Sequence, residues 1–152
     1  MKILSLTISF VLFTIAGVFA QIENPVKWTY TAKKVSDKVY EIHMQATLDP
    51  KWHIYAQEAG EGPEPTVISF TKNPLLKLDE ATKEVGKLEK QYDENFKSVL
   101  KFYANKVDFV QRVKLKSSAA TVLKGTISYM VCNDRKCLPP KEVTFSVKLD
   151  GK

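Results

Sequence analysis

The sequence is poor in the residues from which most metal sites and hydrolytic active sites are built. It contains only two histidines and two cysteines among 152 residues. Zinc sites take four ligands, usually closely spaced pairs of cysteine or histidine, and neither His43 nor His53 has such a partner in the sequence. A nucleophile-elbow motif and a glycine-rich phosphate loop are also absent. We therefore expect no metal and no small-molecule cofactor, and the sequence gives no support to a hydrolase.

Long apolar runs are absent after the first 20 residues, where no segment approaches the roughly 20 apolar residues of a membrane-spanning helix. The first 20 residues do contain such a run. Lys2 precedes it, and the small residues Val18 and Ala20 end it in a cleavage-site pattern. These features are typical of a signal peptide, and a retained membrane anchor is the alternative. We expect cleavage after Ala20, a mature domain of residues 21–152, and a periplasmic or secreted location.

The charged residues do not form the basic patch that nucleic-acid binding requires. Lysine and arginine number 23 against 17 acidic residues, a net charge of +6. The lysines are scattered and no basic run is interleaved with aromatic residues, so nucleic acid is not an expected partner. The length suits one domain. Such a domain buries enough apolar surface to fold without a disulfide, so a disulfide here would be optional for folding.

Apolar and polar side chains alternate through residues 38–48. Tyr40, Ile42 and Met44 fall on one side, and polar residues including His43 fall on the other. A period of two predicts a half-buried β-strand. The same alternation recurs in residues 28–32, 66–70, 107–115, 126–131 and 143–149. About seven or eight short strands separated by turn-rich segments predict an all-β sandwich.

Residues 78–96 do not fit either secondary structure well. Their composition favours a helix, but Gly86 interrupts them and their periodicity is weak. The sequence therefore leaves this segment ambiguous between helix and strand.

Both cysteines lie in one short stretch, SYMVCNDRKCLPPKEVTFSV, with four residues between Cys132 and Cys137. A disulfide between them would close a loop of about six residues, which stabilises a fold by only about 2 kcal/mol against about 4.7 kcal/mol for a 100-residue loop. The bond would also join two chain segments that a hairpin already holds together. Disulfides that are strained or exposed are the labile ones. We therefore favour a redox-active pair, with a structural staple as the alternative.

The surroundings of the two cysteines predict different roles for them. Cys132 directly follows an apolar strand, so we expect its sulfur to be partly buried, which raises the pKa of a thiol and slows its attack. Cys137 directly follows Arg135 and Lys136, whose charges favour a thiolate. Pro139 and Pro140 then restrict the backbone after Cys137. We expect Cys137 to exchange with partners and Cys132 to resolve the mixed disulfide.

Two aromatic segments also stand out. Residues 51–56 contain His53 and Tyr55, and a second segment contains several rings, of which Phe96 is flanked by acidic and amide residues including Glu94. Core packing is the ordinary role of such rings. A lone phenylalanine in a polar loop is different, because it either anchors the loop or covers another group.

These stretches together resemble a known family, the amino-terminal periplasmic domain of the disulfide interchange protein DsbD. Residues 129–147 resemble its active-site hairpin: an aromatic strand, a cysteine, a short polar loop, a second cysteine, an apolar residue and two prolines. Residues 92–109 resemble its cap-loop segment. Residues 52–56 resemble its active-site strand, whose two aromatic positions correspond to His53 and Tyr55. The resemblance implies that these two side chains border the cysteine pair.

The resemblance also implies a fold, an activity and partners. The fold would be an immunoglobulin-like β-sandwich, and Cys132 and Cys137 would pass electrons by thiol–disulfide exchange. The domain would take reductant from a membrane electron-transfer protein and deliver it to periplasmic proteins, with thioredoxin-like proteins among its partners. Phe96 would shield the pair until a partner docks, and Glu94 would belong to the surroundings of this cap. The second cysteine would form the mixed disulfides.

The sequence departs from the family pattern in places. Four residues separate the cysteines where the best-known members have five, and His53 stands where tyrosine is expected. DsbD continues into a transmembrane section and a thioredoxin-like domain, whereas this sequence ends at Lys152. A stand-alone domain would be a free-standing relay, the partner of a separate membrane protein, or a relative without the relay role. Whether it acts as an enzyme, in a protein-disulfide reductase, stays open. The rival is a secreted, non-enzymatic binding module whose disulfide shapes a loop.

Overall fold

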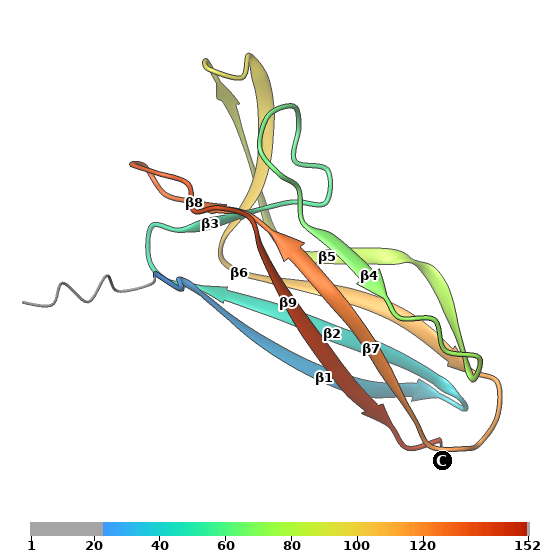
Figure 1. Ribbon diagram of the computed structural model, residues 1–152. Coiled ribbons are helices and arrows are strands. Elements are labelled where there is room, and N and C mark those ends of the chain that lie inside the picture. Colours follow the sequence, from blue (N-terminus) through green and yellow to red (C-terminus); the bar gives the residue numbers. More distant parts are fainter. Residues whose placement is uncertain (1–22, 152) are drawn as a thin grey trace, which may run out of the picture.

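The computed structural model describes residues 23–151, so the predicted signal peptide lies outside the described residues. Within this range the chain forms nine strands and no helix (Figure 1). The sequence predicted seven or eight strands, and it did not predict the two-residue strand Val131–Cys132 as a separate element. No helix of the described residues is long and apolar enough to cross a membrane.

The strands form two antiparallel sheets, which confirms the expected immunoglobulin-like β-sandwich. The larger sheet has the order β1-β2-β6-β3-β8, with β5 also paired to β6. Its strands are β1 (Val26–Ser36), β2 (Val39–Leu48), β3 (His53–Tyr55), β5 (Leu76–Asp93), β6 (Ser98–Leu115) and β8 (Val131–Cys132). The smaller sheet has the order β4-β7-β9 and consists of β4 (Val67–Phe70), β7 (Thr121–Tyr129) and β9 (Lys141–Leu149).

The core lies between the two sheets and follows the period-two pattern of the sequence. The apolar residues of β2 are buried, and Ile42 and Met44 are completely so. They belong to one cluster with Phe109 of β6, Ile127 of β7 and Phe145 of β9. Because this cluster joins both sheets, it holds the end of the sandwich that carries the cysteines in a fixed position.

The ambiguous segment is a strand, β5, which pairs with β6 along its length. Its Glu- and Lys-rich composition is overridden because β6 supplies hydrogen-bond partners for its backbone. The pairing is irregular between Asp79 and Lys83. There the buried side chain of Gln111 donates to the carbonyl oxygens of Asp79 and Glu80, both at 3.1 Å, so the irregular backbone keeps its hydrogen bonds.

Three connections meet at one end of the sandwich. The tip of the β5–β6 hairpin projects there, beside residues 57–66 and the loop that follows β8 (Figure 1). The chain reaches β8 by changing sheets, because β7 belongs to the smaller sheet and β8 pairs with β3 of the larger one. This change of sheet places Cys132 at the edge of the larger sheet, below the projecting hairpin.

Candidate redox site

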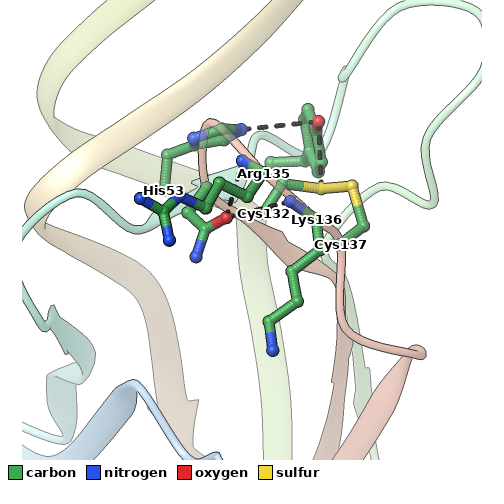
Figure 2. The surroundings of a disulfide bond; sticks show 7 residues. His53, Cys132, Arg135, Lys136 and Cys137 are labelled. Atoms are coloured by element: carbon green, nitrogen blue, oxygen red, sulfur yellow. Dashed lines mark hydrogen bonds between the residues drawn. A yellow bond between two sulfur atoms is a disulfide. The ribbon is translucent and has the colours of Figure 1, made fainter.

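Cys132 and Cys137 are joined by a disulfide bond, with their Cα atoms 4.0 Å apart. The two residues face each other as an isolated antiparallel bridge. Asn133 shapes the loop between them. Its side-chain oxygen accepts the backbone N–H groups of Arg135 and Lys136, each at 2.9 Å, and its own N–H donates to the carbonyl oxygen of Lys136 at 2.9 Å. The loop is therefore held by its own polar groups (Figure 2).

The two half-cystines differ in exposure. Cys132 is only 2% exposed and belongs to a small buried cluster with Tyr55, Ala59 and Leu100. Cys137 is exposed. The predicted burial of Cys132 is confirmed, and a reagent in solvent has direct access only to the Cys137 side of the bond.

Strand β3 brings two of the predicted site residues to the buried sulfur. His53 lies opposite Cys132 in the pairing of β3 with β8. The hydroxyl of Tyr55 donates to the sulfur of Cys132 at 3.3 Å, and Nε2 of His53 lies 3.4 Å from the same hydroxyl oxygen. The three side chains form a continuous line of contacts (Figure 2).

Burial shifts the pKa of both β3 side chains. Burial lowers the pKa of His53, while the negative charges of Asp134 and Glu89 oppose this shift. Burial raises the pKa of Tyr55, and the charge of Asp93 adds to the effect. The ring of His53 also lies 4.4 Å, between centroids, from the ring of Phe102 on β6. The neutral forms of both side chains are therefore favoured near neutral pH.

The disulfide lies in a cavity of 480 Å³ between the β5–β6 hairpin and the loop after β8. Its lining includes both cysteines and both predicted β3 residues. Asp93 and Phe96 line it from the hairpin, and Asp134, Arg135 and Lys136 line it from the opposite loop. Charges of both signs therefore surround a disulfide that is open to solvent on its Cys137 side.

Phe96 lines this cavity, as the resemblance implies, but its ring is 47% exposed. The carboxylate of Asp93 accepts the backbone N–H groups of Asn95 and Phe96, at 2.8 Å and 3.1 Å, and so shapes the turn. The ring rests on Gly62, because a Cβ atom there would lie 2.2 Å from a ring carbon. Glu94 is exposed and is not among the cavity-lining residues.

Two functional neighbours were not singled out in the sequence. Gly62 has a φ of 124°, a conformation that favours glycine, and its place within a turn-rich segment was the available signal. Glu23 forms an ion pair with Lys136. This contact partly neutralises one of the two cations that were expected to favour a thiolate at Cys137, and a separation of more than one hundred residues hides it from local reading.

The fold and the site define a β-sandwich domain that carries a half-exposed disulfide at one end. The chain belongs to the family of the N-terminal domain of the thiol:disulfide interchange protein DsbD, whose model matches residues 22–149. The resemblance expected from the sequence is thereby confirmed. No curated protein sequence matches the chain.

Solved structures support the fold. The N-terminal periplasmic domain of ScsB from Proteus mirabilis matches with a TM-score of 0.59 at 20% identity, over 84% of this chain and 47% of that chain. This chain thus spans about half the length of that structure. The reduced N-terminal domain of DsbD from Neisseria meningitidis matches with a TM-score of 0.52 at 15% identity, over 81% of this chain and 86% of that chain.

Proposed function

We propose that Cys132 and Cys137 cycle between disulfide and dithiol, and that the domain relays reducing equivalents in the periplasm. The donor would be a membrane electron-transfer protein or a thioredoxin-like protein, and the acceptors would be exported proteins. The observation that carries the proposal is the unequal exposure of the two sulfurs, with Cys132 2% exposed and Cys137 exposed.

This unequal exposure supports a fixed direction of attack. Thiol–disulfide exchange proceeds when a thiolate attacks one sulfur of a disulfide and the other sulfur leaves. An incoming thiolate reaches Cys137 from the cavity, whereas Cys132 is covered by Tyr55 and its buried neighbours. Cys137 is therefore the sulfur that bonds to partners, and Cys132 is the leaving and resolving sulfur.

The electrons balance over one full cycle. The donor thiolate attacks Cys137, the bond to Cys132 breaks, and its electron pair stays on the Cys132 sulfur. A second donor thiol then displaces Cys137 and leaves the domain as a dithiol. Cys137 next attacks the disulfide of an acceptor, and Cys132 attacks Cys137 and releases the acceptor as a thiol. Two electrons have then moved from donor to acceptor.

The cavity favours a partner with a protruding cysteine. Such a partner has to insert its sulfur between the Phe96 hairpin and the loop of Arg135 to reach Cys137. The mixture of acidic and basic lining residues would orient the encounter. A periplasmic location fits a disulfide that has to persist between cycles, and the ScsB domain of similar fold is a periplasmic one.

A transfer assay with a thioredoxin-like protein tests this proposal. The domain, reduced and freed of reductant, is mixed with an oxidised thioredoxin-like protein, and the redox state of each is read by alkylation and mass. We expect the Cys132–Cys137 bond to form as the partner becomes a dithiol, to an extent set by the two potentials. Absence of transfer in both directions would contradict the proposal and favour the binding-module alternative.

A further inference from the structure

The side chains of His53 and Tyr55 lead from the cavity to a sulfur that solvent barely reaches. Tyr55 touches the sulfur of Cys132 at 3.3 Å, and His53 touches the hydroxyl of Tyr55 at 3.4 Å. We propose that these two residues form a proton relay for Cys132, in which His53 acts through Tyr55. This inference rests on the proposed exchange function and assigns a role to a histidine that the exchange itself does not use.

Cys132 needs such a relay because its charge changes in an apolar setting. It carries negative charge when it leaves the disulfide, and it has to lose a proton before it attacks again. Its neighbours Ala59 and Leu100 are apolar, and its exposure is only 2%. A buried thiolate without a hydrogen-bond donor is strongly disfavoured. The hydroxyl of Tyr55 is a donor within reach of the sulfur.

Tyr55 cannot complete the path alone, because it is itself only 4% exposed. His53 is less buried and lines the cavity, so it connects the tyrosine hydroxyl with solvent. The Phe102 ring, 4.4 Å away between centroids, and the Tyr55 ring, at an interplanar angle of 90°, hold the imidazole in place. The result is a line from the cavity through His53 and Tyr55 to the sulfur of Cys132, and dashed lines in Figure 2 mark its two contacts.

When the disulfide is reduced, protons move toward the sulfur. A partner thiolate attacks Cys137, the bond between the two cysteines breaks, and its electron pair goes to Cys132. Tyr55 gives its hydroxyl proton to this sulfur and receives the Nε2 proton of the minor, protonated form of His53, which solvent replenishes through the cavity. The histidine becomes neutral and the sulfur becomes a neutral thiol, so no buried charge remains.

When the disulfide forms again, the protons move in the opposite direction. The thiol proton of Cys132 passes to the oxygen of Tyr55, whose own proton passes to Nε2 of a neutral His53. The Cys132 sulfur attacks Cys137, the new bond forms, and the partner leaves as a thiolate. The neutral histidine is therefore the base of the resolving step.

Burial of His53 favours this basic, neutral form. Burial lowers its pKa below its ordinary value, against the opposing charges of Asp134, from the loop after β8, and Glu89 of β5. Asp93 of β5 faces Tyr55, and Arg135 and Lys136 line the same cavity. The rate of the resolving step should therefore hold through neutral pH and fall as the pH drops through the lowered pKa of His53.

With the aromatic disulfide DTNB, the reactions of the two thiols can be followed one after the other. Attack by Cys137 on DTNB releases one coloured thiolate, and attack by Cys132 on the resulting mixed disulfide releases the second. The rate of the second release measures the resolving step. His53→Asn should slow it by about 100-fold at neutral pH, the low end of what a general base contributes. The first release should keep its rate.

Alkaline pH distinguishes a relay from a structural role. At a pH above the pKa of the thiol, which burial raises, Cys132 ionises without a base, so the second release of His53→Asn should approach that of the unsubstituted protein there. Tyr55→Phe should show the same loss and the same recovery. The double variant should be no slower than Tyr55→Phe alone, because both residues act in one path.

The other histidine of the chain provides a matched control. His43 forms a hydrogen bond with Asp108 at 2.7 Å and contributes to a different cavity with Asp108, Thr29 and Thr31. His43→Asn should leave both releases and their pH dependence unchanged. A similar slowing in His43→Asn would show that the effect is not specific to the path through Tyr55, and would overturn the relay.

The outcomes separate the relay from the function on which it rests. A second release that His53→Asn leaves unchanged, or slows equally at every pH, would overturn the relay alone. Failure of the unsubstituted protein to give a second release would overturn exchange and relay together. Two normal releases without transfer to any thioredoxin-like protein would contradict the proposed function, while the pH profiles would still decide the relay.

Discussion

The ring of Phe96 lies directly against Gly62, where a Cβ atom would meet three ring carbons at 2.2–2.7 Å. The hairpin that carries the phenylalanine lines the cavity of the disulfide, and the loop that carries the glycine contributes Ala59 to the buried cluster of Cys132. The contact fixes one side of the ring and leaves 47% of Phe96 exposed. It therefore holds in place one of the side chains that line the cavity around the disulfide.

Removal of the ring should make the reduced cysteines more accessible. In Phe96→Ala, a small alkylating reagent should modify the dithiol several-fold faster, because the cavity loses part of its wall. The rate is measured by mass after quenching at successive times. Tyr92→Ala is the matched control, since Tyr92 is 53% exposed on the same hairpin but does not line the cavity. Equal alkylation rates in Phe96→Ala and Tyr92→Ala would show that Phe96 does not restrict access to the cysteines.

A side chain at residue 62 should destabilise the protein in a way that depends on Phe96. Gly62 has a φ of 124°, so Gly62→Ala should cost about 1–3 kcal/mol of unfolding free energy from backbone strain, with a further cost from the ring. The ring contribution should disappear in the Phe96→Ala background. Urea unfolding of the two single variants and the double variant measures this coupling, and strictly additive losses would contradict the contact.

Reduction of the disulfide should leave the fold intact. Strands β7 and β9 already hold the two ends of this segment, with Tyr129 opposite Lys141, and the N–H of Leu138 bonds to the carbonyl oxygen of Val131 at 2.9 Å. A loop this short should contribute only about 2 kcal/mol. Urea midpoints of the oxidised and reduced forms test this expectation. Unfolding of the domain on reduction would identify the bond as a structural staple.

Single-cysteine variants should reveal which sulfur meets partners. Cys132→Ala leaves the exposed thiol of Cys137, and should accumulate a mixed disulfide with a thioredoxin-like protein that lacks its own resolving cysteine. Cys137→Ala leaves the buried thiol of Cys132, and should trap little of the same protein. Non-reducing electrophoresis measures both yields. The reverse order of yields would exchange the proposed roles.

The strands and the cysteine loop were predictable because they depend on local sequence. The alternation of apolar and polar residues predicted the bounds of β2 and β9 closely. The apolar strand before Cys132 correctly predicted the burial of this cysteine. Segment β5 was not predictable, since its Glu- and Lys-rich residues become a strand only through pairing with the distant β6. Composition alone cannot report such a pairing.

The finer geometry of the site also depends on contacts between distant residues. His53, Tyr55 and Cys132 lie in line because β3 pairs with β8, although Tyr55 and Cys132 are 77 positions apart in the sequence. The ion pair of Lys136 with Glu23 likewise joins opposite ends of the sequence. The resemblance placed both β3 residues near the cysteines, but it did not specify which atom contacts the sulfur.

The reduction potential of the Cys132–Cys137 pair tests the central claim most directly. The protein is equilibrated in thiol–disulfide buffers of known potential, and the fractions of dithiol and disulfide are read by alkylation and mass. An exchange-active pair should have a potential between about −120 and −270 mV, within the range of known thiol–disulfide exchange proteins. A potential below about −300 mV would be that of a structural disulfide and would contradict the proposed relay.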